Sequence, residues 1–455
     1  MGKLWQKNYD LDKTMERFTV GEDPTLDLEL AEFDVLGSIA HARMLQRIGI
    51  LTKGELKKIQ RELVKVLAQV ERRTFVIKPE QEDVHTAVEQ RLTAKLGDAG
   101  KKIHTARSRN DQVIVDLRLY GKARLLSVMR DLLALAEALV AFAEKHQGVP
   151  MVGRTHMQRA MPSSVGLWAG AYLESLLDDF ELLKAAYAIN DQCPLGSAAS
   201  YGVPLVIDRQ YVSEALGFAK VQNNVLYANN SRGKTESIIL GALAQIGVDL
   251  SRLAEDGMIF SMPEFGYFSL PDELCTGSSI MPNKKNPGGL EETRAKAANL
   301  IAHLVQTLEL LRGLPSGYNR DGQETKEPFV RGLQIAQGML RVCRVIAEKM
   351  RVNEAKCVAA FDGEVFATDR ALELVVEGVP FRDAYRQVAA TLHELQARDP
   401  REAIAKKTHQ GAPANLRLDL SRDRIAGCAR FVAGESERFG AALGDLLGAD
   451  VRLPI

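Results

Sequence analysis

The sequence contains five long stretches in which apolar residues recur every three or four positions. In one of them Leu125, Met129 and Leu132 follow this spacing, which places an apolar stripe along one face of a helix. Each stretch is longer than the roughly three turns of a typical globular helix. They are Arg124–His146, Ser163–Asn190, Thr235–Phe260, Glu291–Leu314 and Glu327–Met350. Because such stripes must be buried against other helices, we predict an all-α fold built on a central bundle of long up-and-down helices.

Shorter helical patterns flank this centre on both sides. They cover Leu28–Ile48, Lys53–Val70 and Glu82–Leu96 before it, and Ala367–Glu377 and Phe381–Ala397 after it. A chain of 455 residues exceeds the size at which a single core stops growing. We therefore predict three helical domains. They are an N-terminal domain of residues 1–109, the bundle with a catalytic loop at 110–361, and a small C-terminal domain at 362–455.

The charge balance and the cysteines narrow the class of protein. Lysine plus arginine equals aspartate plus glutamate, 59 of each, so no net field favours nucleic acid or an anionic membrane as a partner. The five cysteines are scattered without a CxxC pair, which predicts a reduced, cytoplasmic protein without structural zinc. No apolar run reaches the roughly 18 residues of a membrane-spanning helix.

One polar cluster precedes the first long helix. His104–Gln112 reads HTARSRNDQ and offers the side chains of Ser108, Arg109 and Asn110 in consecutive positions. A guanidinium next to hydroxyl and amide groups is suited to binding a carboxylate. The alternative is that Ser108, Asn110 or Asp111 caps the helix and the arginines are solvated.

A second polar cluster, GRTHMQRAMP at Gly153–Pro162, lies at the start of the second bundle helix, which is predicted from Ser163. His156 is a candidate acid or base, since imidazole changes charge near neutral pH. Thr155 lies beside it in a segment too polar for a core face. Most single histidines are structural, and that alternative stays open here.

Two further segments interrupt the helical pattern. TGSSIMPNKKNP at Thr276–Pro287 combines a hydroxyl-bearing turn with two prolines that forbid a helix, which is typical of a lid over a site. A hydroxyl such as that of Ser278 becomes a base when cations like Lys284 stabilise its alkoxide. The second segment, Ser316–Pro328, carries polar side chains between the last two long helices. Either segment could instead be a solvated loop.

Together these segments resemble the fumarase/aspartase superfamily. The pattern GSSxMPxKxNP is matched at Gly277–Pro287. Within the superfamily, HTxRSRNDQ at His104–Gln112, THxQRAxP at Thr155–Pro162 and YNxDxQExKE at Tyr318–Glu327 are similar to the argininosuccinate lyase family. Similarity extends over nearly the whole chain.

The resemblance implies an assembly and a reaction. The expected assembly is a homotetramer whose long helices merge into one helical core, with each active site shared between three subunits. The expected reaction on a small-molecule substrate is cleavage of argininosuccinate to arginine and fumarate, without metal or organic cofactor. It removes a proton next to a carboxylate, which leaves an aci-carboxylate, and then expels the guanidinium nitrogen.

The resemblance also implies residue roles. Ser278 is expected to be the general base, and Lys284 with Asn286 to stabilise the intermediate. His156 is expected to be the general acid, with Glu291 as the carboxylate that orients it. The residues expected to bind the substrate are Ser108, Arg109, Asn110, Thr155, Asn286, Tyr318, Gln323 and Lys326.

The chain departs from the family pattern at several positions. Ala106 replaces a glycine, Arg154 a tyrosine and Asn283 a glutamine; Tyr227 and Gly233 stand where aspartates are expected, although Arg232 remains. The segment Phe18–Asp27 lacks a serine expected to contact substrate. Because of these changes, the sequence does not determine which amine forms the second half of the substrate. The alternatives are a fumarate-releasing lyase for another N-substituted aspartate, and a non-catalytic protein like the crystallins of this family.

Overall fold

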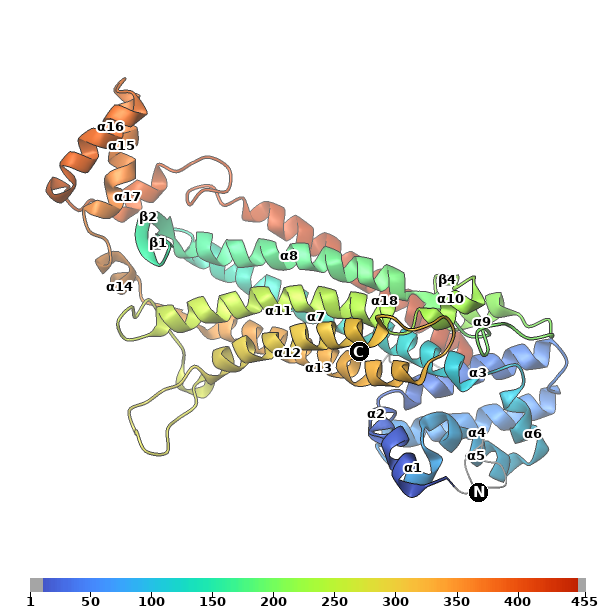
Figure 1. Ribbon diagram of the computed structural model, residues 1–455. Coiled ribbons are helices and arrows are strands. Elements are labelled where there is room, and N and C mark those ends of the chain that lie inside the picture. The colour runs from blue at the N-terminus through green and yellow to red at the C-terminus, as the bar shows by residue number, and fades with distance from the viewer. Residues whose placement is uncertain (1–10, 449–455) are drawn as a thin grey trace.

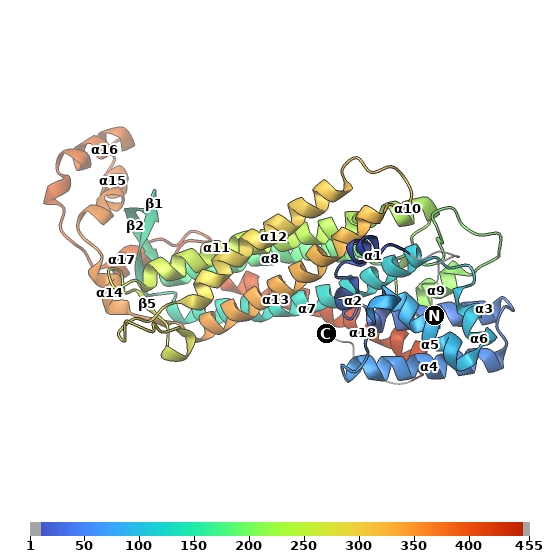
Figure 2. The same cartoon turned by 60° about the horizontal axis from the view of Figure 1, so that its bottom comes forward.

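The computed structural model describes residues 11–448 of the chain. Its main body is a bundle of long helices that run along one axis (Figure 1), and Figure 2 shows the same arrangement from a second direction. The bundle consists of α7 (Arg109–His146), α8 (Val165–Asn190), α11 (Lys234–Ser261), α12 (Gly288–Leu311), α13 (Lys326–Lys349) and α18 (Leu418–Leu447). The predicted all-α fold with a central long-helix bundle is confirmed. The tetrameric core stays a prediction.

All five predicted long helices are present, and α7 is the one whose start was misplaced. It begins at Arg109, well before the predicted start at Arg124. Its first turns bury charged residues, among them Asp111, Asp116 and Lys122. Buried charges interrupt the apolar pattern from which a helix is predicted.

Helix α18 was not predicted, since only short pieces were expected after residue 397. It buries Ile425, Val432 and Phe439 in the main core, while Gly427 and Gly434 dilute its apolar pattern. The helix packs along α7, α8 and α3. The last described residues of the chain therefore return to the bundle.

Short helices of the N-terminal part cover one end of the bundle, at the right of Figure 1. They are α1 (Lys13–Val20), α2 (Asp23–Leu26), α3 (Ala31–Arg47), α4 (Lys53–Glu71), α5 (Val84–Leu96) and α6 (Asp98–Lys101). At the same end lie α9 (Arg209–Ala215), α10 (Val225–Asn230) and the parallel pair of β3 (Gln192–Cys193) with β4 (Lys220–Val221). The three helices predicted before the bundle are confirmed as α3, α4 and α5.

The opposite end carries the small helices that follow the bundle. They are α14 (Glu354–Ala359), α15 (Ala367–Val376), α16 (Phe381–Ala390) and α17 (Pro400–Ala405). Two antiparallel strand pairs lie there, β1 (Pro150–Thr155) with β2 (Gln158–Ser164) and β5 (Phe268–Ser269) with β6 (Arg351–Val352). Helix α16 ends earlier than the predicted Ala397.

The second bundle helix, predicted from Ser163, starts close to that residue, and the polar cluster Gly153–Pro162 before it forms a hairpin that was not predicted. This segment forms the β1–β2 hairpin, and α8 begins only at Val165. Pro162 disfavours helical backbone at the residue before it. Ser164 then caps α8, because its Oγ accepts a hydrogen bond from the amide of Leu167 at 3.1 Å.

Helices α11 and α12 differ in how they are covered. Helix α11 is long and apolar enough to cross a membrane by composition, yet 61% of its most apolar window is buried inside the protein, where it packs on α8, α12 and α13. Helix α12 buries one narrow stripe and leaves Ile301, Val305 and Leu308 exposed at 43%, 53% and 50%. The second half of α12 therefore carries an exposed apolar stripe in the single chain.

Candidate active site

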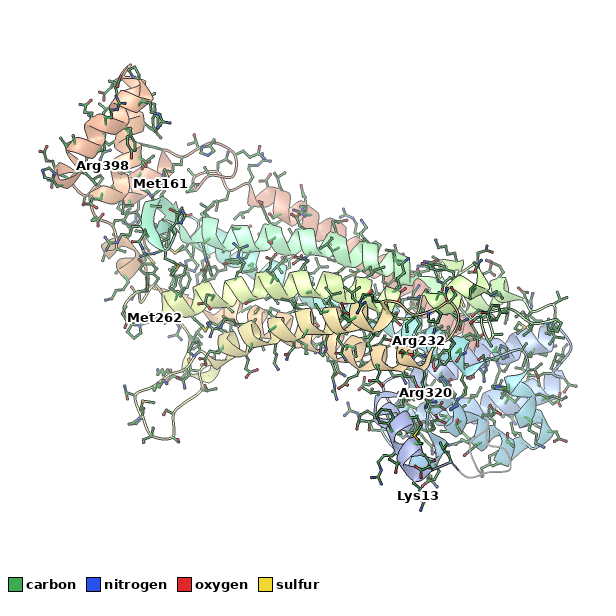
Figure 3. The ribbon with its side chains drawn as sticks, viewed as in Figure 1. Lys13, Met161, Arg232, Met262, Arg320 and Arg398 are labelled. Atoms are coloured by element: carbon green, nitrogen blue, oxygen red, sulfur yellow. The ribbon has the colours of Figure 1, made fainter. Side chains whose placement is uncertain are left out.

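The structure places the predicted site residues at two opposite ends of the bundle. Arg109, Asn110, Tyr318, Gln323 and Lys326 meet in a pocket beside the N-terminal helices. Thr155, His156 and the loop that carries Ser278 lie at the other end. Figure 3 marks the two ends with Arg232 and Arg320 on one side and Met161 and Met262 on the other. Helix α7 spans roughly 57 Å between them, at 1.5 Å per residue over its 38 residues.

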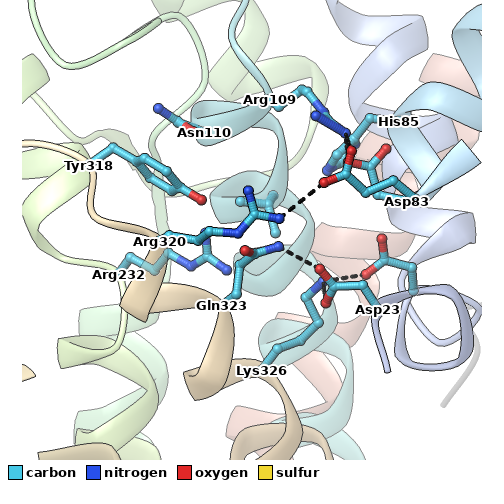
Figure 4. A pocket seen from close by; sticks show the side chains of 13 residues that line it. Asp23, Asp83, His85, Arg109, Asn110, Arg232, Tyr318, Arg320, Gln323 and Lys326 are labelled. Atoms are coloured by element: carbon cyan, nitrogen blue, oxygen red, sulfur yellow. Dashed lines mark hydrogen bonds and ion pairs between the residues drawn. The ribbon is translucent and has the colours of Figure 1, made fainter. Parts of the chain in front are cut away.

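The bundle-end pocket is a charged cavity of about 310 Å³ between the start of α7, the start of α13 and the N-terminal helices. Figure 4 shows its side chains pointing toward one another from these elements. Four carboxylates and four cations line it, namely Asp23, Asp27, Glu82, Asp83, Arg109, Arg232, Arg320 and Lys326. Because formal charges of both signs are balanced, the pocket is suited to a polar ligand that carries both.

Two aspartates of the N-terminal segment hold Lys326 in the pocket. Its Nζ lies 2.7 Å from Asp23 Oδ1 and also contacts Asp27. The other oxygen of Asp23 accepts a hydrogen bond from Gln323 Nε2 at 2.6 Å. Burial alone would lower the pKa of Lys326, but these two carboxylates outweigh it and raise the pKa, so the amine stays charged.

Sequence reasoning missed Asp23 and Asp27 as pocket residues. They belong to the segment Phe18–Asp27, which was noted only for its lost serine. They contact residues about 300 positions away in the chain, and no local sequence pattern predicts such a pair. The departure from the family motif was the one available signal.

The remaining predicted residues of this end have partners of their own. Arg109 Nη2 contacts Asp83 and lies 3.3 Å from Glu82 Oε2 and from Thr86 Oγ1. Ser108 is the N-cap of α7 and does not line the pocket, since its Oγ accepts a hydrogen bond from the amide of Asn110 at 3.2 Å. Ser108 therefore caps α7, and its role in substrate binding stays a prediction.

A buried group of titratable side chains lies under the pocket. His85 Nδ1 is 2.8 Å from Asp34 Oδ1, and Asp116 completes a set of three ligand atoms within 4.8 Å of one another. Burial alone would lower the pKa of His85, but Asp34 raises it, whereas burial and Asp34 together raise the pKa of Asp116 well above its ordinary value. Because these side chains lie so close together, they are expected to titrate as one coupled group and not independently.

One of the departures at residues 223–236 has a local structural reason. Gly233 has φ +80°, and a Cβ there would come within 2.5 Å of the Leu311 side chain, so an aspartate would not fit this backbone. Tyr227 is half exposed, with Lys234 5.3 Å above its ring, and does not line the pocket. Arg232 does line it.

His156 and Met157 form the turn of the β1–β2 hairpin at the far end. Thr155 pairs with Gln158, and the two residues between them have φ +52° and +64°, which corresponds to a type I′ turn. Such backbone is strained for residues other than glycine or asparagine and is often found at functional sites. Arg154 supports the turn, since its Nη1 donates to the carbonyl of Met157 at 3.2 Å. Thr155 and His156 are both exposed.

The loop of residues 276–287 projects from the same end (Figure 1). Thr276 and Asn286 close its base through two backbone hydrogen bonds of 3.0 and 2.8 Å. Inside it, Ser278 Oγ accepts hydrogen bonds from the amides of Ile280 and Met281 at 3.3 and 3.1 Å. Lys284 is exposed. The predicted base thus lies in an exposed loop held together mainly by its own backbone.

Glu291 lies in the first turn of α12, directly after this loop. Its side chain is exposed along an open groove formed by α12 and α13. Within residues 11–448, no hydrogen bond or ion pair joins Glu291 to His156. The single chain brings together the predicted binding residues of the bundle end but does not bring the predicted catalytic residues to them.

Comparisons with known proteins identify the family of this chain. The lyase family model matches residues 7–302. An argininosuccinate lyase of Thermotoga neapolitana is 46% identical over 85% of this chain and 97% of its own length, and one of Phocaeicola vulgatus is 44% identical over 96% and 98%. The chain belongs to the argininosuccinate lyase family.

Solved structures of the wider superfamily share the fold of this family member. A formate complex of EDDS lyase has a TM-score of 0.82 at 22% identity and covers 97% of this chain and 95% of its own. A class II fumarase of Schistosoma mansoni has a TM-score of 0.71 at 16% identity, with 96% of each chain covered. At such identities these structures bear on the fold alone.

Proposed function

We propose that this chain catalyses the reversible β-elimination of argininosuccinate to L-arginine and fumarate. The observation that supports this most directly is the bundle-end pocket. It gathers Arg109, Asn110, Tyr318, Gln323 and Lys326, which the motif resemblance assigns to substrate binding, from segments far apart in the sequence. Its mixed charges suit a substrate that carries carboxylate, ammonium and guanidinium groups.

The first chemical step removes a proton from the carbon next to a carboxylate, and Ser278 is the proposed base. The two amides that donate to its Oγ would stabilise an alkoxide there. The product of this step is an aci-carboxylate with additional negative charge. Lys284 and Asn286 belong to the same loop and are proposed to stabilise that charge, where one placed donor is typically worth about 3 kcal/mol.

The second step expels the guanidinium nitrogen, which needs a proton. His156 is the proposed acid, presented at the exposed tip of its hairpin with Thr155 beside it as a substrate ligand. Glu291 is the proposed carboxylate partner. Because the two side chains do not meet within the described chain, we propose that they meet between subunits.

A homotetramer with sites shared between three subunits would unite the two ends. One subunit would supply the bundle-end pocket, a second the hairpin with His156 and a third the loop with Ser278. The exposed stripe of Ile301, Val305 and Leu308 on α12 supports association along the bundle, since a large uncovered apolar patch marks an interaction surface. We further propose that the enzyme is cytoplasmic. We also propose that the chain consists of three domains with boundaries near residues 109 and 361, and that α18 of the last domain packs on the bundle.

The test is to incubate the protein with argininosuccinate and follow the ultraviolet absorbance of fumarate. Fumarate release supports the proposed function. Release only from other N-succinyl amines would support a related lyase for another N-substituted aspartate. The departures from the family pattern at Phe18–Asp27 and at Tyr227 are the observations that favour this second candidate. No release from any of them would favour a non-catalytic role.

A further inference from the structure

The β1–β2 hairpin that presents His156 needs support from outside itself. A two-stranded hairpin alone is at best marginally stable in water. Its turn adds strain, since His156 and Met157 both have positive φ, and the register of the two strands shifts between Gly153 and Arg154. Strained backbone of this kind persists only where the surrounding structure holds it. The position of His156 therefore depends on what holds the two strands.

A cavity of about 460 Å³ lies between the hairpin and the small helices that follow the bundle. Met161 of β2 lines it, together with Leu372 and Glu373 of α15 and Arg398 before α17. Met161 and Arg398 are labelled in Figure 3, where they lie close together at this end. The apolar core shared by α15 and α16 includes no hairpin residue within residues 11–448. On this side, polar contacts at the edge of the cavity therefore connect the hairpin to the small helices.

Lys407, which also lines the cavity, makes the more buried of these contacts. Its Nζ donates a hydrogen bond to the carbonyl oxygen of Pro162 at 2.9 Å and lies 3.4 Å from Asp369 Oδ1. The side chains of Lys407 and Asp369 are only 18% and 17% exposed, and Pro162 is buried. A hydrogen bond from a charged donor is stronger than one between neutral groups. Lys407 therefore ties β2 to α15.

Arg159 makes a second contact, three residues along the chain from His156. Its Nη1 contacts Asp362 Oδ2. Asp362 is itself held in place, since its Oδ1 accepts a hydrogen bond from the amide of Val365 at 3.2 Å. The Arg159 and Asp362 side chains are 52% and 45% exposed, and an exposed ion pair contributes little. We therefore expect the Lys407 contact to be the stronger of the two.

We propose that Lys407 is a positioning residue for the reaction, because it fixes the hairpin on the small helices and thereby sets where His156 lies. The inference rests on the proposed function, in which His156 is the acid. Lys407 acts through the hairpin and does not touch the reacting atoms. An acid has to approach the leaving nitrogen closely, and a displacement of about 1 Å can cost about a hundredfold in rate. The small helices thus contribute to catalysis although none of their described residues lines the bundle-end pocket.

Hydrogen exchange of the intact protein tests the contact directly. Lys407→Leu keeps the aliphatic bulk and lacks the ammonium. We expect the amides of residues 150–164 to exchange at least about tenfold faster in this variant, as for loss of one hydrogen bond to a charged group, with no change in the bundle helices. Lys406→Leu is the matched control, because Lys406 lies 3.8 Å from Glu373 and makes no hydrogen bond to the hairpin among the described residues. It should exchange like wild type.

Turnover of argininosuccinate tests the positioning role. Lys407→Leu should lower kcat at least about tenfold, whereas Lys406→Leu should retain it. Lys407→Arg should recover most of the loss, since a guanidinium has enough donors for both partners. In a His156→Asn background, Lys407→Leu should have almost no further effect on the residual rate, because changes that act through one group are not additive.

Circular dichroism and the elution volume of each variant show whether it keeps its fold and assembly. Should Lys407→Leu not fold, Lys407→Gln removes the charge, keeps a donor, and should show the same changes in smaller measure. The inference is overturned if the hairpin exchanges at the wild-type rate without the Lys407 charge, or if it exchanges faster while kcat is unchanged. It is also overturned if the variant lowers kcat by the same factor with and without His156.

The exchange measurement does not depend on activity, so it separates this inference from the proposed function. A protein whose hairpin exchanges faster in Lys407→Leu, but whose wild type releases no fumarate, would contradict the proposed reaction and not the contact between Lys407 and the hairpin. Fumarate release by wild type with an unchanged hairpin in the variant would contradict the role of Lys407 and not the reaction.

Discussion

The two ends of the helix bundle present their functional residues in opposite ways. At the pocket end, Lys326 is buried between Asp23 and Asp27, and Arg109 is paired with Asp83. At the far end, His156 lies at an exposed turn and Ser278 in a projecting loop. The comparison teaches that one chain can complete a binding site but not a catalytic site. The predicted binding residues of the pocket lie together within one subunit, and we expect the chemistry to need segments of neighbouring subunits.

The largest expected effect is on turnover at the exposed end. Ser278→Ala should lower kcat about a thousandfold while leaving helical content and assembly unchanged, because it removes the proposed base and no core contact. Fumarate absorbance measures it. Ser279→Ala, one residue further along the same loop, is the control and should retain activity. Full activity in Ser278→Ala would show that the base is another group.

The next effect separates stability from catalysis by comparing two lysines. Lys326→Met leaves Asp23 and Asp27 buried without their cation and should lower the free energy of unfolding by about 3 kcal/mol. Lys284→Met in the exposed loop should change the free energy of unfolding by less than about 0.5 kcal/mol and still abolish most turnover. Urea unfolding and the fumarate assay measure the two quantities. Equal loss of stability in both variants would remove the contrast between the ends.

Acid should weaken the pocket end through His41. Burial, with the positive charge of Arg107 nearby, lowers the pKa of His41 to about 3, and its Nε2 donates to the carbonyl of Thr105 at 2.9 Å. The unfolded chain takes up this proton near pH 6.5, whereas the folded chain does not. Stability is therefore present above pH 6.5 and is lost as pH falls from there toward 3, by up to about 1.4 kcal/mol per unit.

Urea unfolding at pH 7 and pH 5.5 measures this loss. His41→Gln retains a donor for Thr105 but takes up no proton, so its unfolding free energy should fall less between the two values. The difference between wild type and variant isolates His41 from the other ionisable groups. The same slope in both proteins would contradict the assignment.

The smallest expected effect concerns backbone strain at both ends. Ala106, before α7, has φ +61°, and Met157, in the hairpin turn, has φ +64°. Ala106→Gly and Met157→Gly should each raise the free energy of unfolding by about 0.5 kcal/mol, because glycine adopts this backbone without a Cβ clash. Thermal unfolding measures the gain. A loss in either variant would mean that its side chain contributes more by packing than its backbone loses by strain.

The long helices could be predicted from sequence because their apolar stripes follow one helical period. The bounds of α8, α11 and α13 are close to the predicted ones. The start of α7 could not be predicted, because buried charges interrupt that period. Helix α18 could not be predicted, because glycines interrupt it. The hairpin at His156 was not predicted, because its alternation is short and polar.

The candidate site could be predicted only as separate segments. Motifs selected Asn110, Gln323 and Lys326, and the structure brings these into one pocket. Asp23 was not predicted, because its partners are about 300 residues away in the chain and ion pairs across such separations leave no local sequence pattern. In the proposed assembly Ser278 and His156 reach that pocket through contacts between chains, whose geometry a sequence pattern does not describe.

Mixing two inactive variants tests most directly the claim that each active site combines segments of different subunits. Asn110→Ala alters the bundle-end pocket and Ser278→Ala the projecting loop. If the sites are shared, dissociating and reassembling an equal mixture should restore up to about one quarter of wild-type activity, because each of the two contributing subunits is intact at random half of the time.

A mixture of Asn110→Ala with Gln323→Ala is the control. Both residues line the same pocket of one chain, so no intact site can form and activity should stay at the level of the two parents. Recovered fumarate release in the first mixture, and not in the second, is the result that we predict. No recovery in the first mixture, with reassembly into mixed oligomers verified, would contradict a site shared between subunits.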